Sequence, residues 1–138
     1  MYYETDKKKI LLKARNFVHN GERRVEAKSG RAIKRTPERK KFLRDFIQTI
    51  YDRLSVPNHE CYYCGAELKS YQECSLDHKD PLDGKLTHIP ENVEICCFRC
   101  NKLKQDMTVE EFVQKYPSRT LPLQKRLYGQ FEDSESKT

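Results

Sequence analysis

Apolar residues recur at helical spacing in two stretches near the N-terminus, residues 6–18 and 37–54. The apolar positions are Ile10, Leu11, Ala14, Phe17 and Val18 in the first stretch, and Leu43, Phe46, Ile47, Ile50, Tyr51 and Leu54 in the second. Gly21 follows the first stretch as a natural stop, and Thr36-Pro37 opens the second with a capping hydroxyl and a proline suited to the first turn. The pattern therefore predicts two helices, each with one face buried in a core.

The segment between these helices, residues 19–36, shows no sustained period. Its basic residues are Arg23, Arg24, Lys28, Arg31, Lys34 and Arg35. We expect a basic loop or a poorly ordered arm here, with the first helix ending before Gly21.

The second half of the chain has the pattern of a hairpin followed by short helices. Residues 73–77 and 92–96 have the composition of short strands, and the loop between them is rich in turn residues, including two prolines and a glycine. A helix is expected to begin near residue 98 and to continue to about 103. The Thr108-Val109-Glu110-Glu111 run is a capping box that opens a further helix, and one more is expected over 121–127.

Charge is distributed unevenly along the chain. The net charge is +6; residues 1–60 contain 16 lysines and arginines against 8 acidic residues, whereas residues 61–138 contain 11 against 13. Clustered cations of this kind suit a phosphate backbone, although a basic total is also common in proteins that never bind nucleic acid. The charge alone therefore favours a nucleic-acid partner without identifying one.

Composition limits the class of protein. With 138 residues and 36% hydrophobic residues, the chain can form one domain with a terminal extension, and a bound metal would add needed stability. No apolar run approaches the ~20 residues of a membrane span, and the N-terminus lacks the apolar region of a signal peptide. We expect a cytoplasmic protein of bacterial or phage origin, with no membrane partner.

Four of the six cysteines form two Cys-x-x-Cys pairs, Cys61 with Cys64 and Cys97 with Cys100. In a reducing compartment such pairs favour metal ligation over disulfides, and four thiolates suit tetrahedral zinc. Unligated thiols are the plainer alternative. The remaining Cys74 and Cys96 have strand-like neighbours, and we expect them to be small buried apolar side chains.

Polar residues stand between and after the two cysteine pairs in a fixed order. Together with the cysteines they read Cys61-x-x-Cys64, Asp77-His78-x-x-Pro81-Leu82, Asn92, and Cys97-x-x-Cys100-Asn101-x-x-Lys104. This stretch resembles the His-Asn-His (HNH) endonuclease family, in its four-cysteine zinc-containing subgroup with asparagine at the third position. The chain departs from many relatives at Asp83-Gly84, where they carry a double glycine, and we expect this to change the shape of the loop more than its chemistry.

The resemblance implies a role for each polar residue. His78 would be the general base, for which a histidine pKa near working pH is suitable. Asp77 and Asn101 would hold one divalent ion, Mg²⁺ or Mn²⁺, through hard oxygen donors. Asn92 would fasten the loop of the site through side-chain hydrogen bonds. Asn101 stands where many relatives carry histidine, and it keeps an oxygen donor.

Basic residues near this motif are candidates for contacts with the DNA backbone. Lys102 and Lys104 follow the third motif position, and Arg39, Lys40 and Arg44 share the polar face of the helix expected over 37–54. A solvated surface is an equally plain reading for all five. For His88, in the loop before Asn92, a solvated histidine is favoured over a phosphate contact.

These inferences combine into one hypothesis. The fold class is α+β, with a zinc-clasped ββα-metal core, N-terminal helices and a C-terminal helical tail; the expected divisions are a basic extension over 1–56, a nuclease domain over 57–128 and a disordered tail over 129–138. The activity is hydrolysis of DNA phosphodiester bonds. A single site would nick one strand per engagement, so cutting both strands would require a homodimer, a larger complex or a second visit.

Two other classes of protein share part of the pattern. A non-catalytic zinc module that binds nucleic acid, as one part of a phage or mobile-element complex, would explain the cysteines and the basic residues. It would not explain why an Asp-His and two asparagines follow the nuclease order. A thiol-disulfide protein would have redox-active cysteine pairs and no bound metal.

Overall fold

The computed structural model describes residues 4–84 and 86–136. The helices are α1 (Glu4–Ser29), α2 (Pro37–Leu54), α3 (Phe98–Lys104), α4 (Val109–Lys115) and α5 (Leu121–Ser136), and the strands are β1 (His59–Glu60), β2 (Glu67–Leu68), β3 (Ser75–His78) and β4 (Val93–Cys96). Two short 3-10 helices, η1 (Tyr71–Glu73) and η2 (Pro90–Asn92), precede β3 and β4. This composition confirms the predicted α+β class.

Helix α2 has the predicted bounds because its start is encoded locally. The Thr36 hydroxyl accepts a hydrogen bond from the Arg39 backbone N–H at 3.1 Å, and Pro37 occupies the first turn. The buried side chains of the helix, Leu43, Phe46, Ile50 and Leu54, belong to the predicted apolar stripe. The apolar stripe of α2 therefore faces the hydrophobic core.

Helix α1 is longer than predicted, and the expected loop over 19–36 is wrong for its first part. The helix passes through Gly21 and ends at Ser29, where Gly30 adopts a positive φ of 72°. A Cβ atom on Gly21 would lie 2.0 Å from Cε1 of His88. The glycine is therefore a close-packing position inside the helix, a role that its neighbours in sequence do not reveal.

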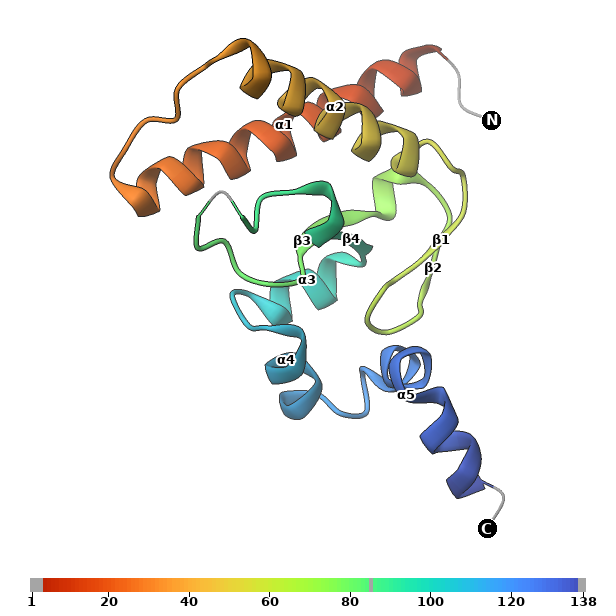
Figure 1. Ribbon diagram of the computed structural model, residues 1–138. Coiled ribbons are helices and arrows are strands. Elements are labelled where there is room, and N and C mark those ends of the chain that lie inside the picture. Colours follow the sequence, from red (N-terminus) through yellow and green to blue (C-terminus); the bar gives the residue numbers. More distant parts are fainter. Residues whose placement is uncertain (1–3, 85, 137–138) are drawn as a thin grey trace.

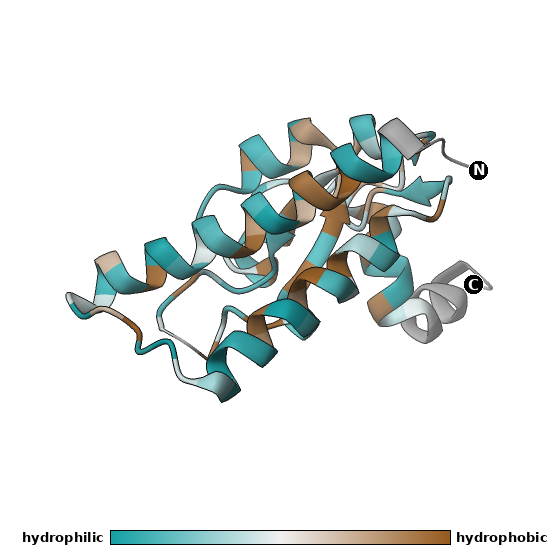
Figure 2. Cartoon of the chain, turned by 90° about the horizontal axis from the view of Figure 1, so that it is seen from above, coloured by the Kyte–Doolittle hydropathy of each residue, from teal (hydrophilic) through white to brown (hydrophobic). Residues whose placement is uncertain are grey.

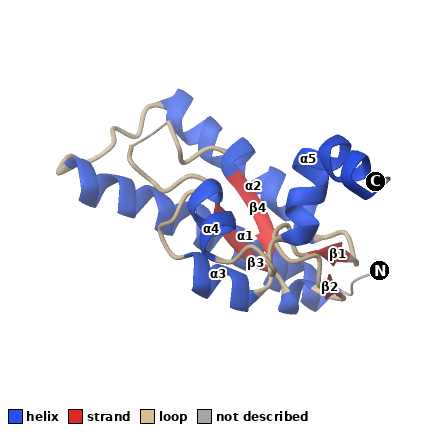
Figure 3. Ribbon diagram, turned by 90° about the horizontal axis from the view of Figure 1, so that it is seen from below, coloured by secondary structure: helices blue, strands red, loops and turns tan. Residues whose placement is uncertain are grey.

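The centre of the molecule is the antiparallel hairpin of β3 and β4, followed by α3 (Figure 3). Asp77 pairs with Glu94 and His78 with Val93, so the Asp-His dipeptide occupies the end of β3. The predicted strands, the helix after them and the capping box at Thr108 are all confirmed. The second sheet consists of the two-residue strands β1 and β2, which flank the first cysteine pair.

The helices enclose the hairpin. In Figure 1, α1 and α2 lie together above β3 and β4, and α3 lies below them. Figure 2 shows apolar residues on the strands and on parts of the surrounding helices. The largest fully buried apolar side chains include Tyr63, Phe46, Phe112, Ile10 and Ile50. Among the described helices, none combines the length and apolar content needed to cross a membrane.

Candidate active site and metal centre

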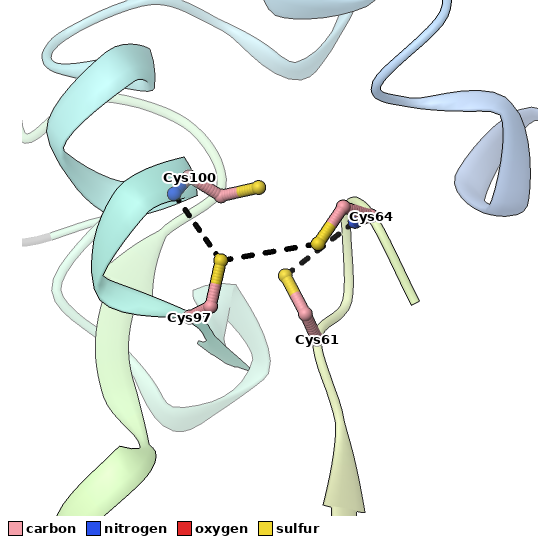
Figure 4. Close-up of side chains that lie close together, drawn as sticks. All are labelled: Cys61, Cys64, Cys97 and Cys100. Atoms are coloured by element: carbon pink, nitrogen blue, oxygen red, sulfur yellow. Dashed lines mark hydrogen bonds between the residues drawn. The ribbon is translucent and has the colours of Figure 1, made fainter. Parts of the chain in front are cut away.

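Four cysteines from two separate turns converge on one point (Figure 4). Cys61 and Cys64 lie on the turn between β1 and β2, and Cys97 and Cys100 lie at the start of α3. Their four sulfur atoms lie within 4.8 Å of one another. A cluster of four thiols in this arrangement can hold one metal ion, and its chemistry is that of a structural zinc site.

Hydrogen bonds to the sulfur atoms favour the thiolate form that binds a cation. A hydrogen bond from the Cys100 thiol, aided by backbone N–H groups, lowers the pKa of the Cys61 thiol to about 4. The Arg119 guanidinium donates to Cys100 Sγ at 3.0 Å and to Cys97 Sγ at 3.6 Å. Its positive charge offsets part of the excess negative charge that four thiolates would bring to a divalent ion.

The two remaining cysteines lie outside the cluster, as predicted. Cys74 and Cys96 are both fully buried in the main core. Burial raises the pKa of each thiol, so both stay protonated and serve as small apolar side chains.

A cavity of about 390 Å³ opens beside the end of β3. Its lining includes Asp77, His78 and Asn101, three of the four polar residues predicted to form the catalytic site. They come from β3 and from the first turn of α3, so the hairpin and the helix together assemble the site. Its other wall is α1.

Asp77 is buried and held by two donors. Its Oδ2 atom accepts from the Tyr63 hydroxyl at 2.5 Å, and Lys104 Nζ lies 3.1 Å from the same oxygen. Burial raises the pKa of the Asp77 carboxyl, while Tyr63 and Lys104 act in the opposite direction. Oδ1 has no hydrogen-bond partner among the described residues and is not sealed from solvent. The carboxylate thus keeps one oxygen available for a cation.

Asn101 is oriented in a similar way. Its amide nitrogen donates to the Ser75 hydroxyl at the start of β3, which fixes the plane of the amide. The amide oxygen is unpartnered within the described chain and is also open to solvent. Asp77 and Asn101 therefore each offer one free oxygen in the same cavity, the type of donor that Mg²⁺ and Mn²⁺ prefer.

His78 is enclosed on one side and open on the other. The Phe17 ring from α1 stacks on it with a centroid distance of 4.9 Å and an angle of 22°. Nε2 lies 3.0 Å from Nδ1 of His88. Nδ1 of His78 has no partner within the described residues and is not among the buried unpaired atoms. Burial is the main cause that lowers the pKa of His78 to about 3, and the charge of Arg24 and repulsion from a protonated His88 act in the same direction, so the ring is neutral.

His88 is fully buried, whereas the sequence favoured a solvated loop histidine. Its Nε2 atom lies 2.7 Å from the carbonyl oxygen of Val18 in α1, and its ring packs 4.9 Å from the ring of Phe46. Burial also lowers the pKa of His88. This contact between His88 and Val18 holds the loop between β3 and β4 against α1. The two residues are 70 positions apart, so local sequence cannot show the contact.

Asn92 ties together the two ends of that loop. Its amide oxygen accepts from the Asp80 backbone N–H at 3.0 Å, and its amide nitrogen donates to the carbonyls of Asp80 at 2.9 Å and Thr87 at 2.8 Å. The side chain does not line the cavity beside β3. Its hydrogen bonds hold the backbone that follows His78.

Three of the predicted DNA-contacting residues lie in contrasting environments near the hairpin. Lys102 is exposed on α3. Lys104 is fully buried, where its ammonium donates to the His78 carbonyl at 2.9 Å and contacts Asp77. Arg39 forms an ion pair with buried Glu22 at 2.5 Å. Exposure therefore suits Lys102 for a phosphate contact, while Lys104 and Arg39 are engaged inside the protein.

The other two, Lys40 and Arg44, line a separate cavity of about 490 Å³ between α1 and α2. Arg15 of α1 lines that cavity, whereas Arg24 lines the one beside His78. These two arginines are nine residues apart, which places them on nearly opposite sides of a helix with 3.6 residues per turn. Lys40 and Arg44 thus share the far side of α1.

Sequence reasoning missed the contribution of α1 to the cavity. Phe17, Asn20, Gly21 and Arg24 all line it. Their spacing of three, four and seven residues places them on one helical face, and this signal was present in the sequence. Gly21 obscures this signal, because a glycine at that position is typical of the end of a helix.

Comparison with known families agrees with the geometry. Residues 61–107 match the family model for the HNH endonuclease, and the four-cysteine cluster fits the zinc-containing subgroup. No curated protein and no solved structure matches the chain. The matched segment contains both cysteine pairs, β3, β4 and α3, and it leaves out α1 and α2.

Proposed function

We propose that the protein hydrolyses DNA phosphodiester bonds with the help of a divalent metal ion, and the match of residues 61–107 to the HNH endonuclease family model supports this proposal. One observation carries the proposal. A neutral histidine with a free, accessible nitrogen shares a cavity with two unpartnered oxygen donors from Asp77 and Asn101. This set supplies the base and the metal ligands that hydrolysis of a phosphodiester needs.

In this proposal His78 is the general base. Nδ1 takes a proton from a water molecule as the water oxygen forms a bond to phosphorus, and the bond from phosphorus to the departing sugar oxygen breaks. The departing oxygen keeps the electron pair of that bond and takes a proton from solvent. The negative charge of a bound phosphodiester would act against the lowering of the His78 pKa by burial. The stacked Phe17 ring limits rotation of the imidazole.

The proposed ligands of the catalytic ion are Asp77 Oδ1 and Asn101 Oδ1, with Mg²⁺ or Mn²⁺ as the ion. When bound, the ion would supply positive charge for the phosphate and for the departing oxygen. Lys104 and Tyr63 hold the other carboxylate oxygen of Asp77, so we assign them to positioning this ligand. Ser75 plays the same part for Asn101.

We assign zinc in the cysteine cluster a structural role. The cluster joins the turn between β1 and β2 to the start of α3, and Asn101 directly follows Cys100. Zinc binding would therefore fix the helix that carries one catalytic ligand. Thiolates require a reducing environment, which supports the expectation of a cytoplasmic location.

For DNA contacts we propose Arg24 and Lys102. Arg24 lines the cavity, its side chain is 53% exposed, and its ion-pair partner Asp106 is 3.9 Å away, so the guanidinium is available to a phosphate. Lys102 is exposed on the helix that carries Asn101. With one catalytic cavity per chain in this scheme, the product is a nick, and cutting both strands requires a dimer or a larger complex.

The test is incubation of the protein with supercoiled plasmid and Mg²⁺ or Mn²⁺, with and without a chelator. We expect nicked circles only when the divalent ion is present. A chelator can also remove zinc and unfold the domain, so zinc content is measured in the chelated sample. If zinc is retained, adding excess Mg²⁺ should restore nicking. Absence of nicking with DNA binding intact would instead favour a non-catalytic binding module.

A further inference from the structure

Two buried histidines form a chain of hydrogen bonds behind the catalytic cavity. His88 Nε2 lies 2.7 Å from the Val18 carbonyl oxygen, and His88 Nδ1 lies 3.0 Å from His78 Nε2. A carbonyl oxygen can only accept, so Nε2 of His88 carries the proton. A neutral His88 ring then has its lone pair on Nδ1, and Nε2 of His78 must be the donor. The lone pair of neutral His78 is consequently on Nδ1.

We propose that His88 is a positioning residue that holds His78 in the tautomer with its proton on Nε2, leaving Nδ1 as the free nitrogen in the cavity. This inference rests on the proposed function, since it concerns the base of that reaction. Without a partner at Nε2, a neutral imidazole populates both tautomers, and in one of them Nδ1 carries a proton and cannot act as a base. His88 removes that inactive form.

The anchor of this chain lies in α1, outside the segment that matches the family model. The Val18 carbonyl fixes one end of the His88 ring, and the absent side chain of Gly21 leaves the space that the ring occupies. Phe17, from the same helix turn, stacks on His78. The first helix therefore orients the catalytic base as well as covering the hairpin.

A packing role for His88 is the competing explanation, because the ring is fully buried between α1 and Phe46. The two explanations differ in what a substitution removes. Phenylalanine keeps an aromatic ring and loses both nitrogen atoms. Glutamine loses the ring and keeps an oxygen and a nitrogen that can accept from His78 and donate to Val18. A packing role favours His88→Phe, and a positioning role favours His88→Gln.

The first measurement is nuclear magnetic resonance of the ¹⁵N-labelled protein, which reports the hydrogen bond without any substrate. We expect a scalar coupling across the hydrogen bond between His78 Nε2 and His88 Nδ1, with the shared proton on His78. A proton on His78 Nδ1, or no coupling between the rings, would overturn the proposal even if the protein is an active nuclease.

The second measurement is plasmid nicking by His88→Phe and His88→Gln, with zinc content, thermal unfolding and DNA affinity measured for each. His88→Phe is expected to lower kcat roughly 10- to 100-fold, as loss of an outer hydrogen-bond partner of a functional histidine typically does, with DNA affinity unchanged. His88→Gln should recover part of the rate. His59→Phe is the matched control, because its buried Nε2 has no hydrogen-bond partner in the described structure.

Each outcome separates the two claims. A folded His88→Phe variant with wild-type kcat would overturn the positioning role while leaving the nuclease intact. If His88→Phe does not fold, a His88→Gln rate no better than that of His78→Ala would overturn it. A wild-type protein that does not nick DNA would refute the proposed function, and the coupling between the rings would still decide how His78 is held.

Discussion

At the residue scale, the structure gives Lys104 a different place from the one its sequence suggested. From its position after Asn101 on a short helix, Lys104 was a candidate for a surface contact with DNA. Its ammonium is instead fully buried between Asp77 and the His78 carbonyl. Burial of one charge is tolerated because the opposite charge is 3.1 Å away. Spacing along the chain reveals the helix face, whereas the partner on β3 is visible only in three dimensions.

Replacing Lys104 with methionine should destabilise the protein strongly. The substitution keeps a long apolar stem and removes the charge, so Asp77 is left buried with Tyr63 as its remaining donor. We expect a loss of about 3–5 kcal/mol in the free energy of unfolding, measured by denaturant titration. Lys102→Met, on the exposed face of the same helix, is the control and should change stability by less than about 0.5 kcal/mol. Equal effects of the two substitutions would refute the buried pair.

Arg24 should contribute to DNA binding through charge. Arg24→Gln removes a cation that lines the cavity, so DNA affinity should fall uniformly across sequences, and the dependence of log Kd on log salt should become shallower by about one unit. Arg31→Gln, just beyond the end of α1, provides the control. An unchanged salt dependence for Arg24→Gln would remove this residue from the interface.

At the element scale, local signals identified most of the fold and predicted too early an end for its longest helix, α1. The cap at Thr36, the capping box at Thr108 and the strand composition around β3 and β4 act within a few residues, so the sequence predicted these elements well. The length of α1 is harder to predict, because a glycine often ends a helix and the close approach of Gly21 to His88, 67 positions away, is visible only in the tertiary structure. Asp77, His78 and Asn101, which the motif brought together in sequence, line one cavity. The contacts of Phe17 and His88 with His78 are visible only in the tertiary structure.

Gly21→Ala should lower stability, contrary to its effect on an isolated helix. Alanine favours a helix interior by about 1 kcal/mol over glycine, but the new Cβ would lie 2.0 Å from His88 Cε1 and must displace the ring. We expect a net loss of about 1–3 kcal/mol in thermal or denaturant unfolding. Gly129→Ala in α5, where a Cβ meets no atom of the described residues within 4 Å, should leave stability unchanged or slightly raised. A stabilised Gly21→Ala variant would contradict the packing described for His88.

At the scale of the whole molecule, two sets of contacts join distant segments of the chain and stabilise the fold. One is the α1–α2 pair, joined to the hairpin through His88 and a core that includes Val18 and Phe46. The other is the cysteine cluster, which joins the turn between β1 and β2 to α3. The cavity beside β3 lies between α1 and the segment from β3 to α3, because residues from both line it. The lining of this cavity thus comes both from the segment that matches the family model and from the helix α1 that precedes it.

Loss of one cluster ligand should unfold much of the molecule. Cys61→Ser removes a thiolate, so bound zinc should fall from one ion per chain to a small fraction of that value, and the unfolding transition should broaden or vanish. Cys74→Ser is the control: Cys74 is buried outside the cluster and should leave zinc content unchanged. Full zinc occupancy in Cys61→Ser would exclude this ligand set.

The central claim is that the cavity beside β3 is a nuclease site with His78 as its base. The most direct test compares plasmid nicking by wild-type protein and His78→Ala in Mg²⁺, with DNA binding and zinc content measured for both. We expect His78→Ala to lose cleavage on the order of 10²–10⁴-fold, with DNA binding and zinc retained. Undiminished, metal-dependent nicking by His78→Ala would contradict it.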